Sequence, residues 1–442
     1  MEIKEITDII QDIERQAEYA LNPGTPEAPE LRQLRDAAYS ALKTSGLPGP
    51  KDEEYKYAYF GKVLAGQFAG VNPAGTPSEE RTSLAMLNKW DNEDVNLLVL
   101  INGHYIPRLS RWTEDPGAAI ISSLSDQWSK QPQTVMEYFG RVSDYRNDPY
   151  VAWNTAVWSG GLFMHLSDKT VLKKPIVILH LVDSKGTPVL CFPRNLYVAG
   201  NQTHANIIEV YEQNGDHSSF TNSVTECVAF GGAEINLYKF QQRSSKACDI
   251  DHTRISQFGR GVFNAYTFSF DGALVRNNLQ IAMEEEHCEA HLYGLYLLRG
   301  KTLVDNHTVV DHKKANCFSN ELYKGVMDEY ATGVFNGKIF VRPNAQKTNA
   351  FQSNKNLVLT DTASVNTKPQ LEIWADDVKC SHGCTTGQLD PEQLFYLRSR
   401  GLSEESAKGM LLQAFAHDVL EKVGVNFLRQ RLEKMIHERL HD

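Results

Sequence analysis

The sequence of 442 residues has no long apolar run and no concentration of basic residues. It contains no stretch of about eighteen apolar residues, and its first residues mix acids into their apolar positions, so neither a transmembrane helix nor a signal peptide is predicted. The formal net charge is -10, which argues against a protein that binds the phosphates of nucleic acids. We therefore expect a cytoplasmic protein that binds neither membranes nor nucleic acids.

Cysteine is scarce, and its spacing is irregular. An odd number of scattered thiols does not form a disulfide framework and is typical of a reducing compartment. The seven are Cys191, Cys227, Cys248, Cys288, Cys317, Cys380 and Cys384. Hydrophobic residues make up 41% of the chain and charged residues 23%, which are ordinary values for a globular protein and exclude disordered and collagen-like classes.

A phosphate-binding loop is also missing. The tripeptide Gly300-Lys301-Thr302 resembles the end of such a loop. However, Leu295 stands five positions before Gly300, where a glycine is required, and Gly294 is out of register. We therefore predict no nucleotide site in this chain.

Helical periodicity is confined to the two ends of the chain. Apolar residues recur every three or four positions over residues 3–17 and again over residues 31–42, which predicts two amphipathic helices. Near the other end, Asp390 is a helix cap and Pro391 occupies the first helical position, so helices are predicted from there onward.

An aromatic, charged segment follows the second predicted helix. Tyr55, Tyr57 and Tyr59 alternate there, as on one face of an extended segment. We expect this face to pack on a neighbouring domain.

From Val95 onward the sequence consists of short β-rich runs separated by Gly or Asn. An aromatic residue followed closely by glycine recurs, as in Tyr293-Gly294 and Phe335-Asn336-Gly337, and such weak repeats are typical of a β-solenoid with glycine at its corners. A β-sandwich with long loops is the alternative, but Asn-Gly hairpin signals are almost missing.

These patterns predict a mainly β protein in three parts. A β-helix core spans residues 161–388, a helical or mixed domain precedes it over residues 1–160, and a helical domain for docking a partner follows over residues 389–442.

A cluster of two thiols and an imidazole lies just before the C-terminal helices. Apolar residues alternate with polar ones from Leu371 to Ala375, which predicts a strand. Cys380, His382 and Cys384 follow at intervals of two, so in an extended chain they share a face, about 6.6 to 7 Å apart. Such a face suits soft metals or sulfur, although a lone cysteine is usually a small core residue. Three ligands on one segment rarely close a zinc site, so we interpret the cluster as half of a shared site.

Each of two further groups of candidate ligands also has a purely structural interpretation. His307, Asp311 and His312 could bind a metal or act as a base with its orienting group, but a hydrogen-bonded row inside a β core is at least as consistent. The acidic run at residues 284–286, beside His287 and Cys288, is typical of a solvated face.

The C-terminal helices carry candidate anchors for a protein partner. A short capped element with apolar side chains on one face suits docking in a groove. The candidate docking residues are Leu394, Phe395, Leu397, Arg398, Met410 and Phe415.

Longer phrases carry a family resemblance. The segment of the cysteine cluster contains DDVKCSHG and GQLDPEQLFYLRSRG, and a further phrase begins HTVVDHKKANCFSNELYKGVM at His307. Together these phrases are similar to the SufB/SufD family of iron-sulfur cluster assembly proteins, over residues 196–423. The N-terminal phrase GLPGPKDEEYKY resembles the SufD branch, because SufB proteins lack it.

The resemblance implies a right-handed parallel β-helix core flanked by helical domains. It also implies a scaffold subunit that is not an enzyme and that works with SufB and two copies of the ATPase SufC, which docks on the helices after Pro391. Cys380 and His382 match family residues at the SufB–SufD interface, which help to build the nascent cluster. A metal at Cys380 and His382 would then be shared with the partner. Cys384 departs from the family pattern and is only a candidate extra ligand.

From this we expect no cofactor bound stably by the isolated chain and a transient iron ion or iron-sulfur cluster in the complex. Alone, the chain should form a homodimer through the edge near residues 371–378. The alternative is a β-helical enzyme that acts on a polysaccharide. It would need paired carboxylates along a groove, and the acidic run at residues 284–286 has no identifiable partner.

Overall fold

The computed structural model describes residues 12–13, 15–16, 28–74, 86–87, 89–90 and 93–441. The helix predicted over residues 3–17 therefore lies largely outside the described residues, although Ile13 is described and buried. In the described part of the chain, no helix is both long and apolar enough to cross a membrane.

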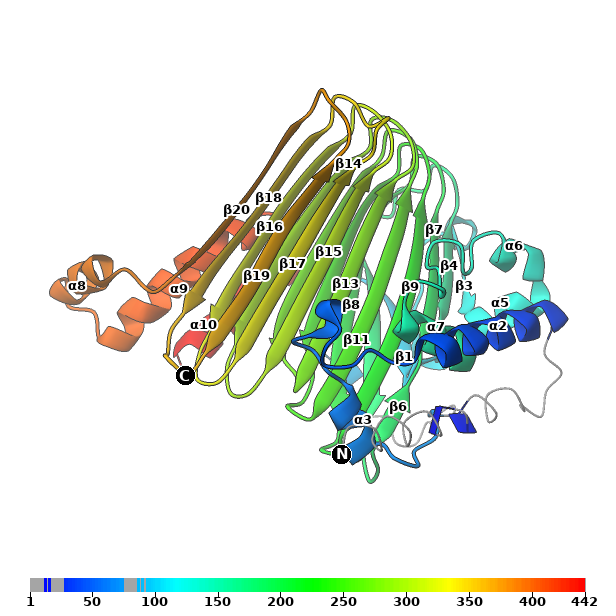
Figure 1. The fold of residues 1–442 in the computed structure, drawn as a ribbon, viewed down its shortest axis with the longest axis horizontal. Coiled ribbons are helices and arrows are strands. Elements are labelled where there is room, and N and C mark those ends of the chain that lie inside the picture. Colours follow the sequence, from blue (N-terminus) through cyan, green and yellow to red (C-terminus); the bar gives the residue numbers. More distant parts are fainter. Residues whose placement is uncertain are drawn as a thin grey trace.

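Two β-sheets form a solenoid in which each coil contributes one strand to each sheet (Figure 1). Sheet A has the order β19-β17-β15-β13-β11-β9-β7-β4-β3, with β6 paired to β9, and sheet B has the order β2-β1-β5-β8-β10-β12-β14-β16-β18-β20. Neighbours are parallel except in the pairs β1–β2 and β3–β4. Because consecutive strands from β7 onward alternate between the sheets, this is a parallel β-helix, and the predicted mainly β fold with helices at both ends is confirmed.

The strands of sheet A are β3 (Ala119–Ser123), β4 (Leu162–Leu166), β6 (Val189–Cys191), β7 (Arg194–Ala199), β9 (Ser219–Ala229), β11 (Ala247–Gln257), β13 (Leu274–Met283), β15 (Leu303–His312), β17 (Thr332–Val341) and β19 (Ser364–Ile373). Those of sheet B are β1 (Asn96–Ile101), β2 (His104–Tyr105), β5 (Ile176–Asp183), β8 (His204–Asn214), β10 (Glu234–Gln242), β12 (Val262–Asp271), β14 (Glu289–Leu298), β16 (Phe318–Met327), β18 (Asn349–Val358) and β20 (Lys379–Gly387). Strands β1 to β3 precede residue 161, so the N-terminal part of the chain supplies strands to both sheets.

Helices cover the outer faces of the sheets. The N-terminal helices are α2 (Pro29–Ser45), α3 (Gly61–Gln67), α5 (Leu124–Lys130), α6 (Pro132–Met136) and α7 (Pro149–Val157), with short 3-10 turns η1 (Glu53–Tyr55), η3 (Pro107–Leu109) and η4 (Pro116–Ala118). The C-terminal helices are α8 (Pro391–Ser399), α9 (Glu404–Leu420) and α10 (Asn426–His441). Apolar residues of α7 pack on sheet A, and those of α9 and α10 pack on the outer face of sheet B. Helix α8 projects beyond the end of the solenoid (Figure 1).

Local sequence signals explain where these elements begin. The predicted helix over residues 31–42 is α2, which buries Leu31, Ala38 and Leu42. The Asp390 side chain accepts a hydrogen bond from the backbone N–H of Glu392, so it caps α8 as predicted. The extended face predicted at Tyr55 is wrong, because Asp52 caps a 3-10 turn there and Tyr55 is buried while Tyr57 is exposed. The segment nevertheless packs on sheet A, since the Arg276 guanidinium lies 4.0 Å from the centre of the Tyr55 ring.

Glycines inside the solenoid make room for aromatic rings on neighbouring coils. Gly294 pairs with Tyr323, and Tyr296 pairs with Gly325, on the adjacent strands β14 and β16. A Cβ atom would lie 2.1 Å from the ring of Tyr323 at Gly294, and 2.1 Å from the ring of Tyr296 at Gly325. The prediction that these repeat glycines occupy corners is therefore wrong: they lie in the middle of strands and face inward.

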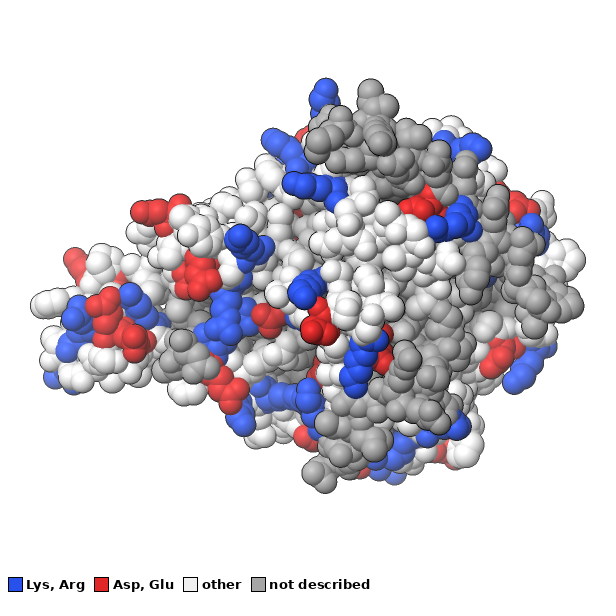
Figure 2. Space-filling model, turned by 90° about the horizontal axis from the view of Figure 1, so that it is seen from below, with Lys and Arg blue, Asp and Glu red and all other residues white. Residues whose placement is uncertain are grey.

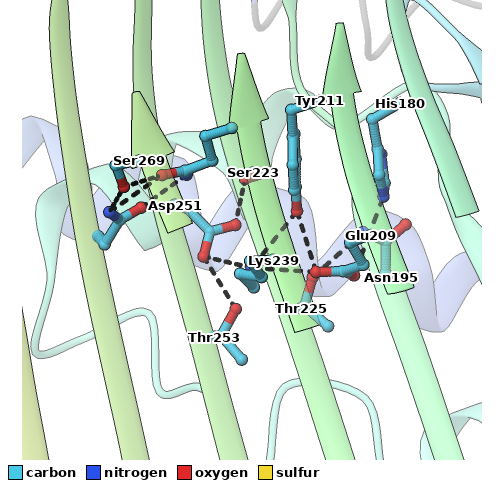
Figure 3. Close-up of polar contacts among 12 residues, drawn as sticks. His180, Asn195, Glu209, Tyr211, Ser223, Thr225, Lys239, Asp251, Thr253 and Ser269 are labelled. Atoms are coloured by element: carbon cyan, nitrogen blue, oxygen red, sulfur yellow. Dashed lines mark hydrogen bonds and ion pairs between the residues drawn. The ribbon is translucent and has the colours of Figure 1, made fainter. Parts of the chain in front are cut away.

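The interior also contains a buried charged cluster (Figure 3). The Lys239 ammonium lies 2.6 Å from Asp251 Oδ1 and 3.2 Å from Glu209 Oε2, and all three side chains are buried. Burial alone would lower the pKa of Lys239, but the two carboxylates raise it overall. Burial would likewise raise the pKa of Glu209, yet Lys239 and the hydrogen bonds from its neighbours hold that pKa below its ordinary value. Tyr197 and Tyr211 donate two of those hydrogen bonds, so this carboxylate is fully paired.

Candidate functional site

The predicted cluster lies on β20, the last strand of sheet B. Within the described residues β20 hydrogen-bonds to β18 on one side only, so it forms an open edge of the sheet. Cys380, His382 and Cys384 pair with Ala350, Gln352 and Asn354 of β18, which are all buried in the interior. The three side chains therefore share the inward-facing row of β20, at the coil where the solenoid ends. The predicted common face is confirmed.

Exposure increases along this row. Cys380 is half-buried against the small apolar cluster that contains Ala350 and Ala375, and burial raises the pKa of its thiol. His382 and Cys384 are exposed, and Cys384 Sγ lies 3.2 Å from Thr367 Oγ1 on β19. The exposure predicted for Cys380 and His382 at the end of the core is thus confirmed.

The strand predicted from Leu371 to Ala375 is partly wrong. Strand β19 ends at Ile373, and residues 374–378 form the connection to β20. The apolar alternation at Leu371 therefore belongs to sheet A, whereas the cluster has a strand of its own in sheet B. Both strands are edges at this end of the solenoid.

The cluster alone does not make a closed metal site. Among the described residues, no group of three or more His, Cys, Asp or Glu side chains is placed to hold a metal ion. Cys380 and Cys384 are four residues apart on one strand, a separation of about 13 Å, which is too far for two metal–sulfur bonds of about 2.3 Å to one ion. Any one ion bound on this row can use His382 with one of the two thiols.

The candidate ligands of β15 do not share one site. His307 faces outward, with Nε2 2.9 Å from Asp305 Oδ1, and Asp311 pairs with Arg342 at 2.7 Å. His312 faces inward, where its Nε2 lies 2.9 Å from Ser319 Oγ.

The acidic run at residues 284–286 lies in a turn between β13 and β14. Glu284 pairs there with Lys313 at 2.6 Å. Glu285 and Glu286 are exposed, and Cys288 is buried.

The predicted docking residues fall into two groups. Phe395 on α8 is 74% exposed and Met410 on α9 is 48% exposed, while Leu394 and Leu397 are half-buried. Phe415 instead packs on the core beside sheet B, with the Lys324 ammonium 4.6 Å from its ring centre. Phe415 is therefore partly covered by the solenoid, whereas Phe395 is mostly exposed.

The helical extension carries charges of both signs. Figure 2 shows basic and acidic side chains close together on the projecting end, and Arg398 lies 3.3 Å from Glu404, which also pairs with Lys408. The surface there is thus mixed in charge and carries exposed aromatic side chains, Phe395 and Tyr396.

The open end of the solenoid has apolar surface that the sequence patterns did not single out. Phe351, Ile373 and Trp374 are 37%, 40% and 48% exposed. Phe351 pairs with Ser381, so it lies on the strand beside Cys380 and faces outward. The alternation of residues in β18 predicts that Phe351 lies on the outer face. It does not predict that Phe351 is exposed, which follows from the position of β18 near the end of the solenoid.

Comparisons with known proteins identify the family of the chain. Residues 180–415 match the family model for the SufBD core domain of the SUF system for FeS cluster assembly, and residues 16–178 match that for the SufBD protein N-terminal region. The chain belongs to the SufBD family. The resemblance to SufB/SufD proteins is thereby confirmed, and the family is one of iron-sulfur cluster assembly.

Similar SufBD proteins occur in bacteria and plants. The chain is 31% identical to an iron-sulfur cluster assembly SufBD family protein of Synechocystis, over 97% of this chain and 95% of that protein. It is 28% identical to the iron-sulfur cluster assembly protein SufD of Escherichia coli, over 94% of each chain. It is 26% identical to the chloroplastic protein ABCI7 of Arabidopsis thaliana, over 89% of this chain and 82% of that protein.

Proposed function

We propose that this SufBD-family chain is a scaffold subunit whose open solenoid end joins that of SufB and contributes Cys380 and His382 to iron-sulfur cluster assembly. The observation that carries the proposal is the row on β20, where a thiol and an imidazole share one accessible face of the edge strand. The iron or cluster is cargo that is built and passed on. Neither residue needs to bind it tightly without the partner.

The edge strands favour pairing between similar solenoids. Strands β19 and β20 both expose unpaired backbone groups, which proteins usually cover by pairing or capping. The exposed Phe351, Ile373 and Trp374 beside them add apolar area for a contact. A partner with the same core would continue the stack, and in its absence two copies of this chain would pair through a two-fold axis. Light scattering should then give a dimer of the isolated chain, and a stable monomer at micromolar concentration would contradict this pairing.

Helix α8 is the proposed docking element for SufC. It projects from the solenoid, none of its residues is buried, and it presents Phe395 and Tyr396. Apolar anchors on a short capped helix suit a groove on a partner. In this division of labour SufC hydrolyses ATP, and this chain has no catalytic site of its own. Tight binding of ATP by the isolated chain would contradict it.

Purified complexes test the role of the row. The chain is co-expressed with SufB and SufC, and iron and acid-labile sulfide are measured for the wild type, Cys380→Ser and His382→Ala. The control is Ser381→Ala, which changes the same strand on its opposite face. Both site variants should lose iron and sulfide while the complex still assembles, and the control should keep them. Full iron and sulfide in both site variants would refute the proposed role.

A further inference from the structure

A cavity of about 290 Å³ lies against the outer face of sheet A, whereas β20 belongs to sheet B. Its floor comes from β11, β13, β15 and β17, and its wall comes from the segments around Asp52 and Asp148. On the floor, Arg254 pairs in register with Gln280, and Gln280 pairs with Val309 of the next coil. Outward-facing residues of four coils thus form one surface. An N-terminal segment covers this surface and leaves the cavity between the two.

Hydrogen bonds on the floor determine which amide atoms are already engaged. Arg254 Nη1 donates to Gln280 Oε1 at 2.7 Å, so the Nε2 group of Gln280 is directed away from Arg254. Arg276 Nε donates to Asn278 Oδ1 at 3.1 Å, which leaves Asn278 Nδ2 as the free donor. That Nδ2 atom is buried and has no hydrogen-bond partner in the described structure. A buried donor without an acceptor is costly, so this position favours a ligand that accepts hydrogen bonds.

The carboxylates around the cavity already have partners within the chain. Glu54 accepts a hydrogen bond from Lys338 at 2.6 Å and lies 3.5 Å from His307, and these contacts, with His307 contributing most, lower the pKa of Glu54 to about 2. Asp52 caps the turn η1, and Asp148 caps α7. Arg254, in contrast, forms no ion pair with any carboxylate among the described residues. Its guanidinium is therefore a positive charge that is available to a ligand.

We propose that this cavity binds a small molecule through an anionic group, a phosphate or a carboxylate, held by Arg254, Gln280 and Asn278. Arginine and amide donors on adjacent strands are about 4.8 Å apart, and Asn278 and Gln280 are about 6.6 to 7 Å apart on one face of β13, so together they can surround the oxygens of one such group. The volume equals that of roughly ten waters of about 30 Å³ each, which sets the ligand at the size of a small metabolite. This site is independent of the cluster-assembly role.

Titration calorimetry on the full chain tests the proposal with inorganic phosphate in one arm and citrate in the other. Sodium chloride of equal ionic strength serves as the reference. Arg254→Gln should weaken binding about tenfold or more, because it removes a charged donor. The control is Arg260→Gln, which removes the same charge from an exposed position outside the cavity and should leave binding unchanged. Binding of phosphate alone or citrate alone identifies the anionic group and supports the site.

Asn278→Asp provides a second, independent variant. It keeps an acceptor for Arg276 but places a negative charge on the cavity floor, so it should abolish anion binding. Melting curves without anion establish that each variant is folded, and the Asn278→Asp result decides the outcome if Arg254→Gln does not fold. The proposal is overturned if neither anion binds the wild type at 10 mM. It is also overturned if the folded cavity variants bind as well as the wild type, or if the control loses as much affinity as they do.

Discussion

Replacement of Lys239 by methionine should destabilise the solenoid strongly. Lys239 is the cation between Glu209 and Asp251, at 3.2 Å and 2.6 Å, in the interior of the solenoid (Figure 3). Methionine has a similar length and no charge, so the substitution leaves two carboxylates close together without a cation. Removing one partner of a buried ion pair costs about 3 to 5 kcal/mol. That is a large part of the usual stability of about 5 to 15 kcal/mol.

The loss should depend on pH in a direction that the structure determines. In the wild type the folded pKa of Glu209 is below its ordinary value of 4.5, so this carboxylate contributes stability above that pH, and the contribution is lost as pH falls. In Lys239→Met, burial without the ammonium should raise the folded pKa of Glu209 instead. Protonation of Glu209 at acid pH then removes its repulsion with Asp251, so the variant loses less stability there. The difference in the free energy of unfolding between the two proteins should therefore be larger at pH 8 than at pH 5.

Urea unfolding followed by circular dichroism at both pH values measures this difference. Lys314→Met is the matched control, because Lys314 is exposed and the same side chain is exchanged. Adding Glu209→Gln and Asp251→Asn to Lys239→Met should recover part of the stability. A loss below about 1 kcal/mol, well under the 3 to 5 expected, or a loss that is equal at pH 8 and pH 5, would refute the reasoning.

Further predictions follow from burial. Of the seven thiols, Cys384 should react first with a thiol reagent and Cys380 more slowly, and reaction of more than these two in the native protein would contradict the fold. Phe395→Ala should weaken SufC binding by about 1 to 3 kcal/mol without changing the melting temperature, because Phe395 is exposed. Phe415→Ala should lower the melting temperature, because Phe415 packs on the core. The reverse pattern would contradict these two roles. Burial raises the pKa of Glu321 from 4.5 to about 7, so the folded state binds an extra proton in this window and stability falls as pH rises through it. Glu321→Gln should remove this decline, worth about 3 kcal/mol by pH 8, and equal pH profiles for the two proteins would contradict it.

The sequence predicts the elements whose burial follows a simple period. The first four residues of strand β10 alternate between outward and buried positions, and α8 begins at the predicted cap Asp390. Strand β9, with the sequence SFTNSVTECVA, has no such alternation, although every residue in it is buried. Its outward Glu226 is buried because Arg194 and three backbone N–H groups of residues 140–143 satisfy the carboxylate. Partners so distant in the chain leave no local signal.

The two sites differ in how far the sequence predicts them. The row on β20 was predictable because Cys380, His382 and Cys384 lie at intervals of two on one strand. The anion cavity was not, because Arg254 and Gln280 come from successive coils and become neighbours only through the register of β11 and β13. Nor does the sequence indicate that Phe415 packs on the core while Phe395 does not, since both fit the apolar stripe of a helix.

On two successive coils, Gly294 pairs with Tyr323 and Tyr296 pairs with Gly325. Each tyrosine ring thus occupies the space left by a glycine on the other coil. Coils with similar sequences could stack out of step by two residues and still keep their apolar side chains inside. Such a slip would place Tyr296 against Tyr323, so these two rings would no longer lie over glycines and would have to repack. The two pairs therefore favour the observed alignment of these coils, and the strands that follow, including β20 with its cysteine and histidine, continue the same register.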